Sequence, residues 1–117
     1  MHRTAVTVTM GVALLSFLCA DAHAQSILYL TKSSGFEHGA VKRDGDKLGI
    51  GEKVISDLAR DNGDDITVTK DASTINAENL KKYDLVIFYT TGDLFQPSEG
   101  GREEPPMGAN GVQELTQ

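Results

Sequence analysis

The sequence predicts a small α/β protein with a parallel sheet, and two kinds of pattern support this. Three short runs, residues 26–31, 66–69 and 85–89, are rich in apolar or β-branched residues and have the length of strands. Helical patterns separate them, at residues 47–61 and 77–82. The order strand, helix, strand, helix, strand, with crossovers of this length, favours parallel strands joined by right-handed connections.

The three predicted strands differ in the burial that we expect. Residues 26–31 are nearly continuous in apolar character and lack helical spacing, which is typical of a strand buried on both faces. Residues 66–69 alternate β-branched side chains and predict a more exposed strand. Residues 85–89 are the most apolar window after the first two dozen residues, so we predict that they form the central strand. Residues 32–46 have no period and predict a long loop.

The first predicted helix, residues 47–61, has one apolar side, which we expect to lie on the sheet. The apolar side comprises Leu48, Gly51, Val54, Ile55, Leu58 and Ala59, and the polar side comprises Glu52, Lys53, Ser56, Asp57 and Arg60. Asn62-Gly63 supplies a helix stop. The second helix, residues 77–82, has Asn76 as a candidate N-cap.

The last part of the chain changes in composition. Residues 96–111 are dominated by Pro, Gly and Glu and predict an exposed loop, while Val112 and Leu115 indicate the start of another helix. A doubly wound sheet usually has about five strands or more, so three strands favour a truncated part of a larger domain. A complete three-stranded miniature is the alternative.

The first 24 residues have the pattern of a secretory signal peptide. Arg3 precedes an apolar run from Ala5 to Cys19, and Ala22-His23-Ala24 has the small-residue spacing of a cleavage site. We therefore predict cleavage after Ala24 and a secreted or periplasmic protein. The apolar run is shorter than the roughly 20 residues that span a bilayer, so we expect no membrane attachment after cleavage, with a retained anchor as the alternative.

Charge and motifs exclude several function classes. The chain has a formal net charge of −6, which argues against a nucleic-acid partner. Cleavage would remove Cys19, the one cysteine, and with it disulfides and a cysteine nucleophile. Gly49-Ile50-Gly51 begins like a dinucleotide fingerprint, but Val54 stands where the third glycine belongs. We expect no cofactor and no metal, since Asp93 has no partner carboxylate at ligand spacing.

Candidate site residues follow the first and third predicted strands. Ligands of open parallel sheets bind beyond the carboxyl ends of the strands, where strand order reverses, and in a flavodoxin-like order these two strands are neighbours. His38, the only histidine after residue 24, is the candidate catalytic residue, as a general base or acid. The candidate ligand-binding residues are Lys32, Gly35, Phe36, Glu37, Thr90, Thr91 and Gly92.

Each candidate also has a purely structural interpretation. His38 could only hydrogen-bond to the loop backbone, and Glu37 could pair with it or face water. Phe36 could fill a small satellite core. The two glycines could serve ordinary turns, and the two threonines could cap the sheet.

Three separated segments, residues 28–38, 69–72 and 80–93, resemble in order the opening half of a trehalose-utilisation (ThuA-like) domain. The resemblance implies a class I glutamine-amidotransferase-like fold, a role in carbohydrate metabolism, and a cleft lined by residues 35–38 and 90–92. It implies that residues 25–95 are the N-terminal half of such a domain and that residues 96–117 are a loop and the start of a helix. The family's next Gly-rich strand, with a further histidine, has no counterpart before Gln117.

The leading hypothesis is an exported domain that binds or acts on a sugar or sugar derivative, with its enzymatic status open. A non-catalytic binding or scaffold module of a larger exported protein is the competing hypothesis. A third is that the chain forms nothing stable alone, because an uncovered sheet edge favours aggregation.

Overall fold

A computed structural model describes residues 23–117, so most of the predicted signal peptide lies outside the described residues. Three parallel strands form one sheet in the order β2-β1-β3: β1 (Ser26–Leu30), β2 (Asp65–Thr69) and β3 (Leu85–Phe88). In register, Leu28 pairs with Thr67 on one side and with Val86 on the other. The structure confirms the predicted parallel α/β fold, and the strand order is that of the first three strands of a flavodoxin-like sheet.

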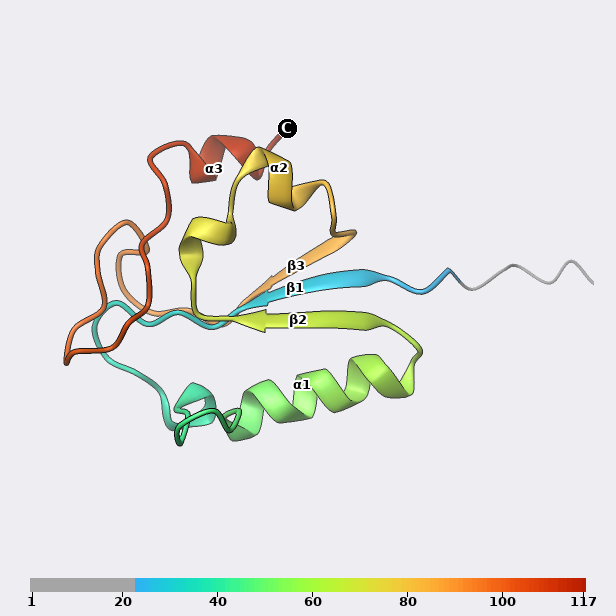
Figure 1. Cartoon of the computed structure of the whole chain (residues 1–117), viewed down its shortest axis with the longest axis horizontal. Helices are drawn as coiled ribbons and strands as arrows, with labels where there is room; N and C mark the ends of the chain where they lie inside the picture. The colour runs from blue at the N-terminus through green and yellow to red at the C-terminus, as the bar shows by residue number, and fades with distance from the viewer. Residues whose placement is uncertain (1–22) are drawn as a thin grey trace, which may run out of the picture.

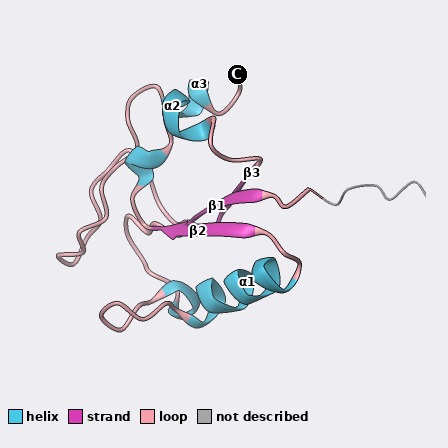
Figure 2. Ribbon diagram, turned by 45° about the vertical axis from the view of Figure 1, so that its right-hand side comes forward, coloured by secondary structure: helices cyan, strands magenta, loops and turns pink. Residues whose placement is uncertain are grey.

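Helices cover both faces of this sheet (Figure 1). The helix α1 (Ile50–Asp61) lies on one face, and the short helices α2 (Ala77–Leu80) and α3 (Gly111–Glu114) lie together on the other (Figure 2). Two 3-10 turns, η1 (Gly39–Val41) and η2 (Ala72–Thr74), follow the carboxyl ends of β1 and β2. None of the helices in residues 23–117 is long and apolar enough to cross a membrane.

The core lies between the sheet and the η2–α2 face. It comprises Leu28, Leu30, Ala72, Ile75 and Met107. Met107 comes from the segment predicted to be an exposed loop, and Glu104 and Gly111 of the same segment are also buried, so that prediction is wrong for these three residues. The segment turns inward because the Met107 N–H donates to the Leu94 carbonyl (2.8 Å) and Pro105 accepts from the Ala72 N–H (3.0 Å).

The predicted burial of β1 is confirmed, and the predicted central position of β3 is wrong. Residues 27–30 of β1 are all buried, as expected of a strand covered on both faces. The central strand of the described sheet is β1, whereas β3 lies at an edge and leaves Leu85 and Phe88 exposed. Apolar composition reports only that a strand suits burial, and the order of strands depends on which of them pair.

The buried side of α1 also differs from the expectation. Glu52 and Ser56, predicted to face solvent, are buried together with Ala59. Val54 and Leu58, predicted to face the sheet, are 55% and 58% exposed. The Glu52 side of α1 faces inward because the Glu52 carboxylate accepts hydrogen bonds from Arg43, Gly49 and Thr31. The exposed apolar side chains of α1 line a groove of about 370 Å³ beside Phe88 and Tyr89.

Candidate functional site

The two loops expected to meet at the carboxyl ends of β1 and β3 do meet. The Ser34 N–H donates to the Thr91 carbonyl (2.9 Å), and the Thr91 N–H donates to the Lys32 carbonyl (3.3 Å). The Thr91 hydroxyl donates to the Phe36 carbonyl. These bonds extend the β1–β3 pairing beyond the strands and hold residues 33–36 against residues 90–92.

His38 belongs to an exposed group of rings that also contains Phe36 and Tyr89, which we call the aromatic cluster. The His38 ring lies edge-on to Phe36, with centroids 5.0 Å apart, and edge-on to Tyr89 at 6.0 Å. Phe36 is 72% exposed and Tyr89 is 41% exposed. Phe36 therefore does not fill a satellite core, and the cluster faces solvent at the end of the sheet where ligands of this fold class bind.

The polar groups of His38 and Glu37 go to different places. The His38 imidazole makes no hydrogen bond within the described part of the chain, although the His38 carbonyl accepts from the Val41 N–H (3.1 Å). Glu37 forms a salt bridge with Lys70 (3.0 Å) and does not pair with His38. The imidazole is consequently free to bind a ligand or exchange a proton.

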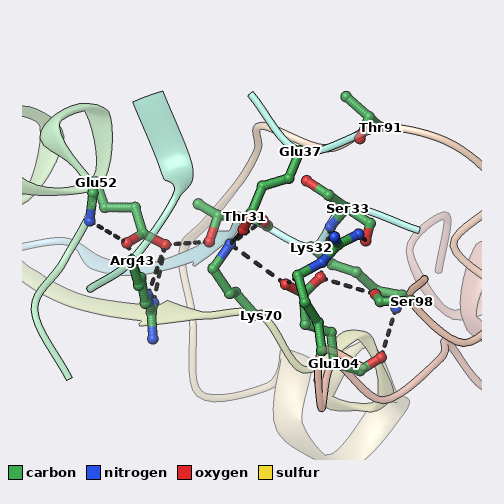
Figure 3. Close-up of polar contacts among 12 residues, drawn as sticks. Thr31, Lys32, Ser33, Glu37, Arg43, Glu52, Lys70, Thr91, Ser98 and Glu104 are labelled. Carbon is green, nitrogen blue, oxygen red and sulfur yellow. Dashed lines mark hydrogen bonds and ion pairs between the residues drawn. The ribbon is translucent and has the colours of Figure 1, made fainter. Parts of the chain in front are cut away.

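Lys32 lies inside the protein. Its ammonium donates to the Ser98 hydroxyl (2.7 Å) and to the Glu104 carbonyl (2.6 Å). The Glu104 carboxylate accepts from the Ser33 N–H (2.8 Å), so the tail is tied to the end of β1 (Figure 3). Burial lowers the pKa of Lys32, and the nearby Glu104 carboxylate opposes that shift. A ligand would reach Lys32 only if residues 98–104 moved.

Glu52 is a fully buried carboxylate, although the helical pattern places it on the polar side of α1. It accepts from Arg43 through Nε (2.9 Å) and Nη2 (3.0 Å), from the Gly49 N–H (2.9 Å) and from the Thr31 hydroxyl (Figure 3). Burial by itself would raise the pKa of Glu52, but these hydrogen bonds and the Arg43 charge outweigh burial and hold the pKa below its usual value. The signal was present, since Glu52 stands three residues after the N-cap Gly49, the capping-box position.

Gly92 is required by the backbone where the two loops touch. Its φ is +74°, and an added Cβ would lie 3.1 Å from Ser34 Cβ and 3.2 Å from the Gly35 nitrogen. Gly35 itself has no atom near an added Cβ, and its carbonyl accepts from Arg102 Nη2 (2.7 Å). Thr90 is half-buried just after β3. Of the two glycines, only Gly92 is needed for its conformation.

We expect Gly92→Ala to lower the free energy of unfolding by about 1–2 kcal/mol, because alanine is strained at positive φ and its Cβ would crowd Ser34. Gly108→Ala is the matched control, since nothing lies within 4 Å of an added Cβ there. Urea unfolding of both variants checks the difference. Equal stability of the two variants would show that the loops separate without cost.

The aromatic cluster and the loop residues beside it offer ring faces, amides, hydroxyls and one imidazole. In residues 23–117 no group of three or more His, Cys, Asp or Glu side chains is placed to hold a metal ion. The arrangement suits a neutral polar ligand with an apolar face, and His38 could add proton transfer. No family model, curated protein or solved structure matches the chain.

Proposed function

We propose that this chain is part of an exported ThuA-like domain that binds or acts on a sugar or sugar derivative at the aromatic cluster. The observation that carries the proposal is the exposed edge-to-face group of Phe36, His38 and Tyr89 beyond the carboxyl ends of β1 and β3. Exposed rings in a group are unusual unless something covers them, because large apolar surfaces are normally buried.

A sugar fits the chemistry of the cluster. Its C–H faces pack on aromatic rings, while its hydroxyl groups need donors and acceptors near the ring edge. The His38 imidazole can act as a donor or as an acceptor, because its two ring nitrogens have different hydrogen-bonding roles. A binding role needs the ring faces of Phe36 and Tyr89, whereas a catalytic role needs the imidazole.

We expect Phe36→Ala to weaken sugar binding about tenfold, because it removes the most exposed ring of the cluster. Isothermal titration of the full chain against disaccharides and oxidised sugars measures this. Phe95→Ala is the matched control, since Phe95 is also exposed but does not stack on the cluster rings. If the wild-type chain binds none of these sugars, or if Phe36→Ala and Phe95→Ala bind as well as wild type, the proposal fails.

His38→Ala separates binding from catalysis. If the variant keeps the affinity of the wild type but loses turnover of a sugar that the wild type converts, His38 acts as a proton donor or acceptor. If it loses affinity in proportion to Phe36→Ala, the imidazole contributes as a ligand contact.

A scaffold module of a larger exported protein is the second candidate. Two exposed apolar side chains of α1, Ile50 and Val54, favour it, because they line a groove with Phe88 of β3, an edge strand of the described sheet. If the chain is a scaffold module, isothermal titration with sugars would give no heat of binding, and another domain would cover the groove beside β3.

A further inference from the structure

A second hollow, of about 400 Å³, lies at the same end of the sheet but does not include the aromatic cluster. We call it the charged cleft. Its lining residues are Glu37, Lys42, Arg43, Gly45, Lys70, Arg102, Glu103 and Glu104. They come from the loop after β1, the segment before α1, the end of β2 and the tail, so folding alone brings these charges together.

The carboxylates of the inner wall are already engaged. Glu104 accepts from the Ser33 N–H (2.8 Å) and the Ser98 hydroxyl (2.9 Å), and Glu37 pairs with Lys70 (3.0 Å). Lys70 also donates to the Thr31 carbonyl (3.2 Å) and lies 3.6 Å from Glu104. Lys70 and these two carboxylates therefore already have protein partners and are poorly available to a ligand.

Unlike Lys70, Arg43 and Arg102 each have one part of the guanidinium group held by the protein and another part without a hydrogen-bond partner. Arg43 binds Glu52 through Nε and Nη2. Arg102 donates from Nη2 to the carbonyls of Ser33 (2.9 Å) and Gly35 (2.7 Å), and its Nε lies 3.4 Å from the Glu104 carboxylate, with which it forms an ion pair. Within residues 23–117 the Nη1 groups of both arginines have no hydrogen-bond acceptor. Their side chains stay about one quarter exposed, at 27% and 26%.

Fixed guanidinium groups with free N–H donors are suited to oxyanions. A guanidinium that is already held in place loses little conformational freedom when it binds, and its planar N–H groups match the oxygens of phosphate or carboxylate. Lys42 is exposed at the rim and has no ion-pair partner in the described part of the chain. Glu103, also exposed, is the one lining carboxylate without a cation of its own there and should oppose an anion.

We propose that the charged cleft binds an oxyanion, a phosphate or a carboxylate group, between Arg43 and Arg102, with Lys42 at the rim. This site is separate from the aromatic cluster, so it does not depend on the proposed sugar site. Binding should be weak and should weaken further with added salt, because the cleft is open to solvent and surface charges are screened.

The test is a residue-resolved NMR titration of the full chain at low salt with inorganic phosphate and, separately, with acetate. We expect saturable shifts at residues 42–45 and 102–104. Lys42→Glu should weaken binding about tenfold, and Glu103→Gln should strengthen it about threefold, since each alters the charge at the rim. Lys47→Glu is the matched control, because Lys47 is also exposed but lines a different hollow, and its affinity should stay within about twofold.

The anion that binds more tightly identifies the group, phosphate or carboxylate. Shifts that do not saturate with either anion would overturn the proposal. Equal weakening by Lys42→Glu and Lys47→Glu would also overturn it, because that result would reflect the overall charge of the chain. The Glu103→Gln arm keeps the test decisive even if Lys42→Glu were to perturb the loop.

Discussion

Glu52→Ala is expected to lower the free energy of unfolding by about 3 kcal/mol, one of the largest effects of any single change in the described chain. Removing a buried ion-pair partner leaves the other polar groups unsatisfied, at a cost of roughly 3–5 kcal/mol when both are buried. The lower end applies here because Arg43 is partly exposed and can regain water. The Gly49 N–H and Thr31 hydroxyl also lose their acceptor. Urea unfolding at neutral pH measures the loss.

Lys53→Ala is the matched control for this prediction. Lys53 is the next residue of the same helix, and its ion pair with Asp57 is exposed on both sides. Exposed pairs contribute little, so we expect a change within about 0.5 kcal/mol. A similar loss in both variants would mean that α1 responds to any substitution and that the buried carboxylate is not special.

The same carboxylate predicts a pH dependence. Because its folded pKa lies below the usual value of 4.5, Glu52 contributes stability that is complete above that value and is lost as pH falls through the lowered pKa. Glu52→Gln should therefore lose less stability than the wild type as the pH falls below about 4.5. Parallel acid-unfolding curves for the two proteins would contradict this assignment.

Leu30→Ala is expected to cost about 3 kcal/mol. Leu30 is fully buried in β1, where it packs in the cluster with Ile75 and Met107, and its truncation leaves a cavity in addition to the lost burial. The Leu58→Ala control, at a side chain that is 58% exposed, should change stability by no more than about 0.5 kcal/mol. Urea unfolding of both variants measures the two losses of stability. Equal losses would contradict the position of Leu30 in the core.

Local sequence patterns predicted the helices and strands, and their order along the chain, well. The three strands, α1 and the short α2 lie within a few residues of the expected ranges, and the rule for parallel sheets correctly brought residues 33–36 and 90–92 together. Those inferences needed only neighbouring residues or a general rule of topology.

The errors arise where distant residues decide the outcome. Lys32 was expected beside a ligand, but its partners Ser98 and Glu104 lie 66 and 72 residues away in the chain. The helical pattern predicted that Glu52 faces solvent, because such a pattern carries no information about Arg43, which lies outside the helix and binds the Glu52 carboxylate. Met107 carries no periodic signal at all, yet it fills the core. The edge position of β3 likewise depends on pairing rather than composition.

A residue-resolved NMR titration of the full chain with disaccharides and oxidised sugars locates any sugar site on the chain. If a sugar binds at the aromatic cluster, the amides of residues 35–38 and 89–92 will shift saturably while those of α2 and α3 stay in place. Shifts that never saturate, or that are confined to the α2 and α3 face, would contradict the proposed sugar site.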